Sequence, residues 1–159
     1  MLRFFLASLI TGSGIIIGGV LSIVAKDELR PGKRYFILLK NVLFFSVMLA
    51  TSLYYVRINP LVSMIPLVFL GLLFMKKFRL NLAYISFAIA CILAYSNSSL
   101  FMFVSSLIFF AGFPIGTVAA HELIRKEIFV ERMILVPYFI FVLICAAWAL
   151  FGYFYLRIM

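Results

Sequence analysis

Long uncharged apolar runs are the feature that most restricts how this chain can fold. Residues 4–25 form a run of 22 without a charged side chain, and residues 80–120 form another of 41. About 20 apolar residues are enough for a helix to cross the hydrocarbon core of a bilayer. With 67% hydrophobic and 12% charged residues, the chain has too little charge to cover a water-soluble domain. The sequence therefore predicts an all-α integral membrane protein, because the alternation expected of a membrane β-barrel is missing.

Turn-forming residues divide the apolar runs into six predicted transmembrane helices, packed as one compact bundle and one domain over residues 1–159. Asn59-Pro60 predicts a tight turn, and Ser96-Asn97-Ser98-Ser99 divides the longest run into two helices. Pro66 and Pro114 are expected to bend their helices. The helices are predicted over residues 4–25, 35–56, 61–75, 80–95, 100–120 and 133–156.

The positions of the basic residues predict the orientation. One side of the predicted bundle, formed by the connections after the first, third and fifth helices, holds eleven Lys and Arg, whereas the other side holds Arg3, Arg57 and Arg157. The positive-inside rule then puts both termini outside a cell membrane that the chain crosses several times. We do not expect nucleic-acid binding despite the net charge of +9, because the basic residues lie at the ends of apolar runs, where they anchor helices next to membrane lipids.

Two of the predicted helices carry a small residue at every fourth position. This spacing puts the small residues on one helix face, where a neighbouring helix can approach closely. The two strips are Gly14, Gly18 and Ser22 in the first helix, and Gly112, Gly116 and Ala120 in the fifth. Because both helices run from outside to inside, the sequence predicts that the strips pack on each other or around one cavity.

The ionisable residues gather in two charged stretches, 25–35 and 121–132, which hold all five carboxylates and the only histidine. Carboxylates can hold Mg²⁺ and basic groups can bind a phosphate. The spacing alone favours a simpler explanation, in which these residues anchor the helices and form surface ion pairs. We expect Cys91 and Cys145 to be small buried side chains rather than disulfide or metal partners, since each lies inside an apolar run.

Three short segments resemble motifs of the UbiA-type intramembrane prenyltransferases. Arg30-Pro31-Gly32-Lys33 is similar to the Arg-Pro segment that follows that family's first acidic motif. Phe74-Met75-Lys76-Lys77-Phe78 is similar to its basic aromatic segment, and the stretch from His121-Glu122 to Glu127 lies where the second acidic motif is expected. The resemblance would cover helices two to seven of the nine in that family.

This resemblance implies a Mg²⁺-dependent transferase acting on isoprenoid or other lipid substrates at the cytoplasmic face, without identifying a catalytic residue. The metal ligands it implies are Asp27, Glu28, Glu122 and Glu127, and the diphosphate-binding residues are Lys33, Arg34, Lys77 and Arg125. The chain departs from the family's pattern, because Asp27 and Glu28 are the whole first acidic motif and the second has Glu instead of several Asp. An inactive relative therefore fits the sequence as well as an active enzyme.

A non-enzymatic membrane bundle is the alternative from another class of protein. Such a bundle would be a small channel or transporter, a homo-oligomer, or a subunit of a larger membrane complex. The small-residue strips suit this alternative equally, because they can pack within the chain or against a partner. A secondary transporter is less expected, because no predicted helix centre contains the ionisable residue that transport usually requires.

Overall fold

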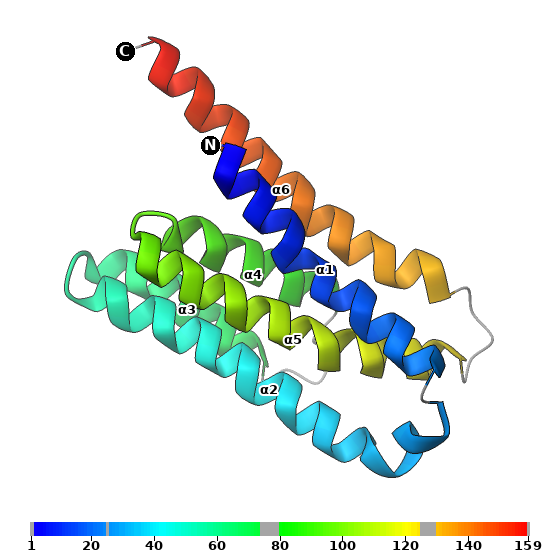
Figure 1. Ribbon diagram of the computed structural model, residues 1–159. Helices are drawn as coiled ribbons and strands as arrows, with labels where there is room; N and C mark the ends of the chain where they lie inside the picture. The colour runs from blue at the N-terminus through cyan, green and yellow to red at the C-terminus, as the bar shows by residue number, and fades with distance from the viewer. Residues whose placement is uncertain (1, 25, 74–79, 125–129, 159) are drawn as a thin grey trace.

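The computed structural model describes the backbone of residues 2–24, 26–73, 80–124 and 130–158, and the side chains of residues 3–24, 31–68, 82–121 and 135–151. Over these backbone ranges the regular secondary structure is all helical, with turns at residues 57–59 and 95–97 (Figure 1), which confirms the predicted all-α class. The helices are α1 (Leu2–Val24), α2 (Lys26–Val56), α3 (Pro60–Leu73), α4 (Leu80–Ala94), α5 (Ser98–Ile124) and α6 (Val130–Ile158).

Three helical segments within the described residues are long and apolar enough to cross a membrane: Arg3–Val24, Pro31–Val56 and Ser98–His121. Two shorter apolar segments, Leu82–Ala94 and Leu135–Phe151, belong to α4 and α6. Six spans and outside termini stay predictions.

The start of α2 differs from the sequence prediction. We expected a loop up to residue 34, but α2 begins at Lys26 and includes Pro31 and Gly32. Pro31 is the sixth residue of α2, just beyond the first four N–H groups that have no partner within a helix, so it removes one backbone hydrogen bond close to the helix start. The charged residues of this segment are therefore helical positions, not loop positions.

Two asparagines start helices at the predicted turns. The Asn59 side-chain oxygen accepts hydrogen bonds from the backbone N–H groups of Leu61 and Val62, at 3.1 and 3.4 Å, with Pro60 as the first residue of α3. The Asn97 side-chain oxygen accepts from the N–H groups of Ser99 and Leu100 at the start of α5, at 3.0 and 3.1 Å. Asparagine caps and an initial proline satisfy helix N-termini, so both predicted turns are confirmed.

Aromatic contacts bring the start of α1 to the connection between α4 and α5. The ring of Phe4 lies 4.8 Å from that of Tyr95 and 5.5 Å from that of Phe101, between centroids. The hydroxyl of Tyr55, near the end of α2, donates to the Leu93 carbonyl at 2.8 Å and lies 3.0 Å from the Ser96 hydroxyl. The α2–α3 and α4–α5 turns therefore lie at the same end of the bundle as the start of α1 (Figure 1).

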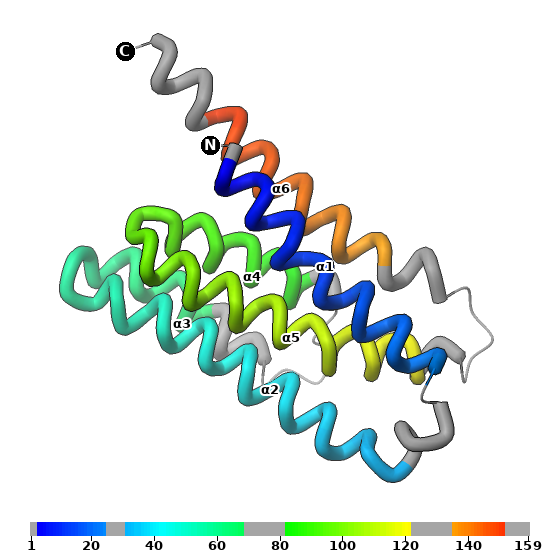
Figure 2. The backbone as a smooth tube through the Cα atoms, in the orientation of Figure 1, coloured from blue at the N-terminus to red at the C-terminus, as the bar shows by residue number. Residues whose placement is uncertain are grey.

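Helices α1 and α5 pack in parallel along a seam of glycines (Figure 2). A Cβ added to Gly14 would collide with the Phe109 carbonyl oxygen, and one added to Gly18 would collide with that of Phe113. From the other side, a Cβ on Gly116 would collide with the Ile15 carbonyl oxygen. The predicted packing of the two strips on each other is thus confirmed at the glycines. We call this contact the α1–α5 seam.

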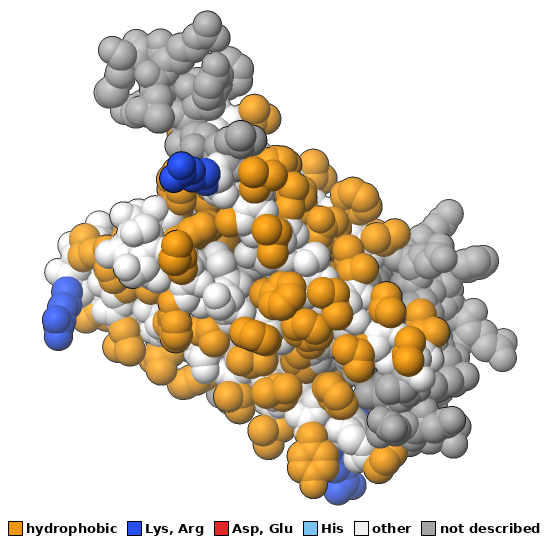
Figure 3. Space-filling view, viewed as in Figure 1, with side chains coloured by type: hydrophobic (Ala, Val, Ile, Leu, Met, Phe, Trp, Pro, Cys, Tyr) orange, Lys and Arg blue, Asp and Glu red, His pale blue; other side chains and the backbone are white. Residues whose placement is uncertain are grey.

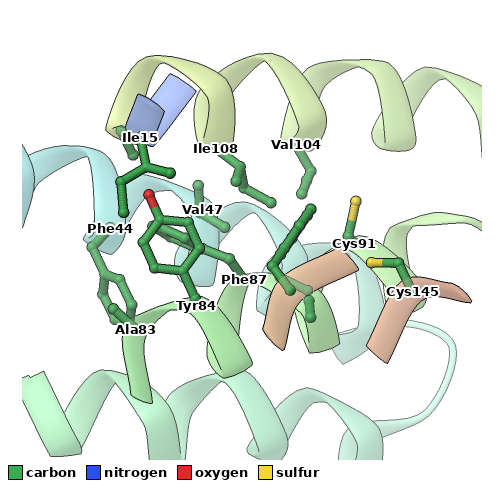
Figure 4. Close-up of a cluster of buried hydrophobic side chains, with 14 of the residues drawn as sticks. Ile15, Phe44, Val47, Ala83, Tyr84, Phe87, Cys91, Val104, Ile108 and Cys145 are labelled. Carbon is green, nitrogen blue, oxygen red and sulfur yellow. The ribbon is translucent and has the colours of Figure 1, made fainter. Parts of the chain in front are cut away.

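A cluster of aromatic and aliphatic side chains fills the space beside the seam (Figure 4). Tyr84 and Phe87 of α4 are fully buried and contact Phe141 of α6 and Phe44 of α2, with ring centroids 5.3–6.3 Å apart. Ile15 of α1 lies in the same cluster. This core fixes the relative positions of the helices that carry the candidate site residues.

The surface of the described part is apolar. Large hydrophobic side chains are exposed on several helices, among them Leu38 and Leu53 of α2 and Leu143 of α6, each more than 60% exposed. Figure 3 shows hydrophobic side chains spread over the visible face, with the Lys and Arg side chains at its margins. Soluble monomers rarely expose apolar patches of this extent, so the surface suits a lipid environment.

Candidate functional site

A small cavity between α2 and α5 combines two nitrogen-bearing side chains. Lys33 and Phe36, one turn apart on α2, line it from one side, and Thr117, Val118 and His121 line it from α5. Its volume of about 10 Å³ is room for one water molecule. Lys33 and His121, which come from the two charged stretches, thus meet at one end of the bundle. We call this the Lys33–His121 cavity.

Thr117 connects the cavity to the α1–α5 seam. Its hydroxyl lies 3.0 Å from the Gly18 carbonyl oxygen on α1 and 2.7 Å from that of Phe113 on its own helix. One turn beyond Gly18, Ser22 is fully buried, and its hydroxyl has no hydrogen-bond partner within the described part of the chain. Because Thr117 both bonds to α1 and lines the cavity, the packing of α5 against α1 positions that wall of the cavity.

Two of the eight predicted site residues have described side chains. Lys33 is half-buried in the cavity wall, and Arg34, the next residue, is exposed. The backbones of Asp27 and Glu28 belong to the first turn of α2, and the backbone of Glu122 belongs to the last turn of α5. Lys77, Arg125 and Glu127 lie outside the described residues. The cavity brings the start of α2 and the end of α5 together.

The metal site stays a prediction. Within the described side chains no group of three or more His, Cys, Asp or Glu could hold a metal ion. All five carboxylates fall outside those side chains. For Mg²⁺ held through oxygen ligands, we expect a separation of roughly 4–8 Å between Asp27 or Glu28 and Glu122 or Glu127.

A groove opens between α1 and the first half of α5, away from the Lys33–His121 cavity. Its volume is about 490 Å³. The α1 side contributes Ala7, Ile10 and Thr11, and the α5 side contributes Phe101, Met102, Ser105, Ser106, Phe109 and Phe110. The groove is apolar with a few hydroxyl groups, which suits a hydrophobic molecule rather than a charged one. We call it the α1–α5 groove.

Sequence reasoning missed a polar contact in the core between α4 and α5, beside a second cysteine on α6. The Cys91 thiol of α4 lies 3.7 Å from the Ser105 hydroxyl of α5. The Cys145 thiol of α6 is buried in the same core cluster, and Figure 4 shows the two cysteines beside each other. Both cysteines are buried, as predicted. Their proximity gave no signal in the sequence, because each cysteine is isolated in its own apolar run.

Comparison with known proteins found no match among protein-family models, curated proteins or solved structures. The resemblance to the UbiA-type prenyltransferases thus stays a prediction from the short motifs quoted above.

Proposed function

We propose that the protein is a multi-pass cell-membrane protein related to the UbiA-type prenyltransferases, which binds the phosphate group of an isoprenoid or other lipid at its cytoplasmic end. The observation that carries the proposal is the meeting of Lys33 and His121 in one cavity wall. Ammonium and imidazole groups donate hydrogen bonds to phosphate oxygens. In this proposal α1 enters from outside, six helices span the membrane, and the Lys33–His121 cavity lies at the inner headgroup level.

The predicted charged residues have defined roles in this proposal. Lys33, Arg34, Lys77 and Arg125 would bind a diphosphate, and Asp27, Glu28, Glu122 and Glu127 would hold Mg²⁺ beside it. Carboxylate oxygens are the ligands that Mg²⁺ prefers, and the bound ion would offset the charge of the diphosphate. The apolar surface and core would contain the lipid tail. Because the cavity holds only about one water molecule, a diphosphate would bind at its mouth and not within it.

The alternative, a non-enzymatic bundle that packs against a partner subunit or a second copy, is also supported by an observation. The Lys33–His121 cavity is small, and α1 and α5 touch through their backbones at the seam. A tightly packed bundle of this kind suits a structural subunit as well as an enzyme with an external binding surface.

Thermal unfolding in lipid nanodiscs tests the phosphate-binding proposal. The protein is titrated with a short prenyl diphosphate and Mg²⁺ together, with each alone, and with inorganic diphosphate plus Mg²⁺. A ligand that binds only the folded state stabilises it by about 2.7 kcal/mol at a free concentration of 100 Kd. We expect the largest rise in Tm with the prenyl diphosphate and Mg²⁺ together. Inorganic diphosphate with Mg²⁺ should give a smaller rise in Tm, because inorganic diphosphate has no prenyl tail.

Two matched variants assign the effect to the cavity. Lys33→Gln removes the basic group in the cavity wall, and Arg57→Gln removes an exposed basic group in the α2–α3 turn at the other end of the bundle. The ligand-induced rise in Tm should be reduced in Lys33→Gln and retained in Arg57→Gln. Equal rises in both variants, or no rise in the unmodified protein, would contradict the proposal. Native mass spectrometry of the purified protein then distinguishes a co-purified isoprenoid from a partner subunit.

A further inference from the structure

The α1–α5 groove ends one helical turn from an exposed arginine. On α1 the groove is lined by Ala7, Ile10 and Thr11. Arg3 lies four residues before Ala7 and seven before Ile10, and these spacings put residues on one face of a helix. The Arg3 side chain is exposed, and helical side chains lean toward the N-terminus, so its guanidinium lies beyond the end of the groove. The groove face of α1 is thus an apolar surface with a cation at one end.

Aromatic packing puts Arg3 level with the start of the groove on α5. The ring of Phe4, the residue next to Arg3, lies 5.5 Å from the ring of Phe101, between centroids. Phe101 is the first of the groove-lining residues on α5. Arg3 also begins the segment Arg3–Val24, which is long and apolar enough to cross a membrane. In a bilayer the guanidinium would therefore lie at the level of the lipid headgroups.

The groove is about as long as one leaflet of a bilayer is thick. Its lining on α5 runs from Phe101 to Phe110, an interval over which an α-helix rises about 13 Å. The hydrocarbon core of a bilayer is about 30 Å thick, so one leaflet contributes about 15 Å. A single hydrocarbon chain that enters beside Arg3 would follow the groove through most of its leaflet.

The hydroxyl groups in the groove already have partners within the chain. Thr11 and Ser106 each donate to the backbone carbonyl four residues earlier, at 2.7 and 2.9 Å. The Ser105 hydroxyl lies 3.7 Å from the Cys91 thiol of α4. Because these groups need no hydrogen bond from a ligand, the groove favours a hydrocarbon chain over a polar molecule.

The acidic residues whose backbones are described lie at the opposite end of the bundle from Arg3. Asp27 and Glu28 begin α2, which follows α1, and Glu122 ends α5, which runs parallel to α1. Glu131 is the second residue of α6, and the fifth acidic residue lies outside the described part of the chain. The length of α1, about 30 Å, separates Arg3 from this end. Within the described residues the Arg3 side chain has no ion pair, so an anion from outside the chain can bind it.

We propose that an anionic phospholipid binds with its phosphate on Arg3 and one acyl chain in the α1–α5 groove. A guanidinium donates two parallel hydrogen bonds to phosphate oxygens. A headgroup with no cation of its own avoids repulsion with that guanidinium. A second copy of this chain in the same orientation would instead bring another Arg3 to this end, so its charge is not complementary. The site is independent of the Lys33–His121 cavity and of the phosphate-binding proposal.

Native mass spectrometry of the delipidated full-length protein tests the site. The protein in detergent receives equimolar phosphatidylglycerol and phosphatidylcholine with identical acyl chains. We expect one phosphatidylglycerol to be retained per chain, several-fold more than phosphatidylcholine. Glycerol phosphate, which has the phosphate but no acyl chain, should not displace the lipid. Equal retention of the two lipids, displacement by glycerol phosphate, or a lipid-free dimer in place of the lipid complex would overturn the proposal.

Matched arginine variants assign the headgroup contact. Arg3→Gln removes the charge beside the groove, and Arg57→Gln removes an exposed charge at the same end that does not line the groove. The preference for phosphatidylglycerol should be lost in Arg3→Gln and retained in Arg57→Gln. Lys33→Gln, at the other end of the bundle, should also retain it, which separates this test from that of the phosphate-binding proposal. An equal preference in Arg3→Gln and Arg57→Gln would contradict the contact with Arg3.

Two variants on α5 test the place of the acyl chain. Ser106→Trp fills the groove from an exposed position outside the core, whereas Phe103→Trp changes an exposed residue that does not line the groove. Retention of phosphatidylglycerol should fall several-fold in Ser106→Trp and be unchanged in Phe103→Trp. Equal retention in these two variants would overturn the groove as the site of the acyl chain.

Discussion

The hydroxyl of Thr117 on α5 lies 3.0 Å from the carbonyl oxygen of Gly18 on α1, a hydrogen bond between residues 99 positions apart. Glycine permits this contact, because a Cβ on residue 18 would collide with the α5 backbone at Phe113. The bond therefore depends on the close approach of the two helices. Since Thr117 also lines the Lys33–His121 cavity, the same contact positions the candidate site.

Thr117→Val should destabilise the bundle more than Thr51→Val. Both threonines are buried and both donate to a carbonyl of their own helix, but only Thr117 has a described bond to another helix. Interhelical hydrogen bonds in membrane proteins contribute roughly 0.6 kcal/mol on average and up to about 1.7. We expect a difference in unfolding free energy of that size in nanodiscs. Equal losses would mean that the bond to Gly18 contributes nothing measurable.

Gly18→Ala and Gly116→Ala should each lower stability, whereas Gly32→Ala should be tolerated. An added Cβ collides with a backbone carbonyl oxygen at Gly18 and Gly116, but at Gly32 it lies 3.6 Å from the flexible Phe36 ring. Overpacking typically costs 1–3 kcal/mol, while replacing a helical glycine with alanine gains about 0.5–1 kcal/mol. Leucine at either seam position should prevent folding. Thermal unfolding of the three alanine variants measures the contrast, and equal Tm values would contradict the seam.

Tyr55→Phe should lower stability by about 1 kcal/mol, the usual net contribution of one hydrogen bond. Its hydroxyl joins the end of α2 to the α4–α5 connection through Leu93 and Ser96. Tyr54→Phe, at the neighbouring half-buried position, is the control. Chemical denaturation of the two variants should separate them, and the prediction is wrong if Tyr54→Phe is the more damaging change.

Tyr84→Phe should leave stability unchanged or raise it. Tyr84 is fully buried, and its hydroxyl has no hydrogen-bond partner within the described part of the chain. A buried polar group without a partner costs about 1–3 kcal/mol, and phenylalanine removes that group while keeping the ring. The same substitution at Tyr55, where the hydroxyl is hydrogen-bonded, should have the opposite sign. A clear fall in Tm for Tyr84→Phe would reveal a partner.

Cysteine labelling in intact cells checks the predicted orientation. Gly32→Cys lies near the start of α2, and Ile58→Cys lies at the exposed α2–α3 turn. The native cysteines are buried and should not react. An impermeant maleimide should label Ile58→Cys from outside and should reach Gly32→Cys only after permeabilisation. The reverse pattern would invert the topology.

The local patterns of the sequence predicted much of the architecture. The length of the apolar runs predicted helices, the asparagines predicted the turns before α3 and α5, and the four-residue spacing of Gly14, Gly18, Gly112 and Gly116 predicted a close helix contact. Each of these features belongs to one helix or one turn. A single helical period is enough to place small residues on one face, so the chain itself contains the information.

Contacts between distant segments were decided only by the tertiary structure. The sequence did not show that α2 continues through Pro31, that Lys33 meets His121, or that Cys91 lies beside Cys145. Each pairing depends on how three or more helices rotate and shift against one another, because the side chains of the whole core must fill one volume without gaps. The spacing of residues along one helix determines which face they share, whereas the packing of that core determines which faces meet.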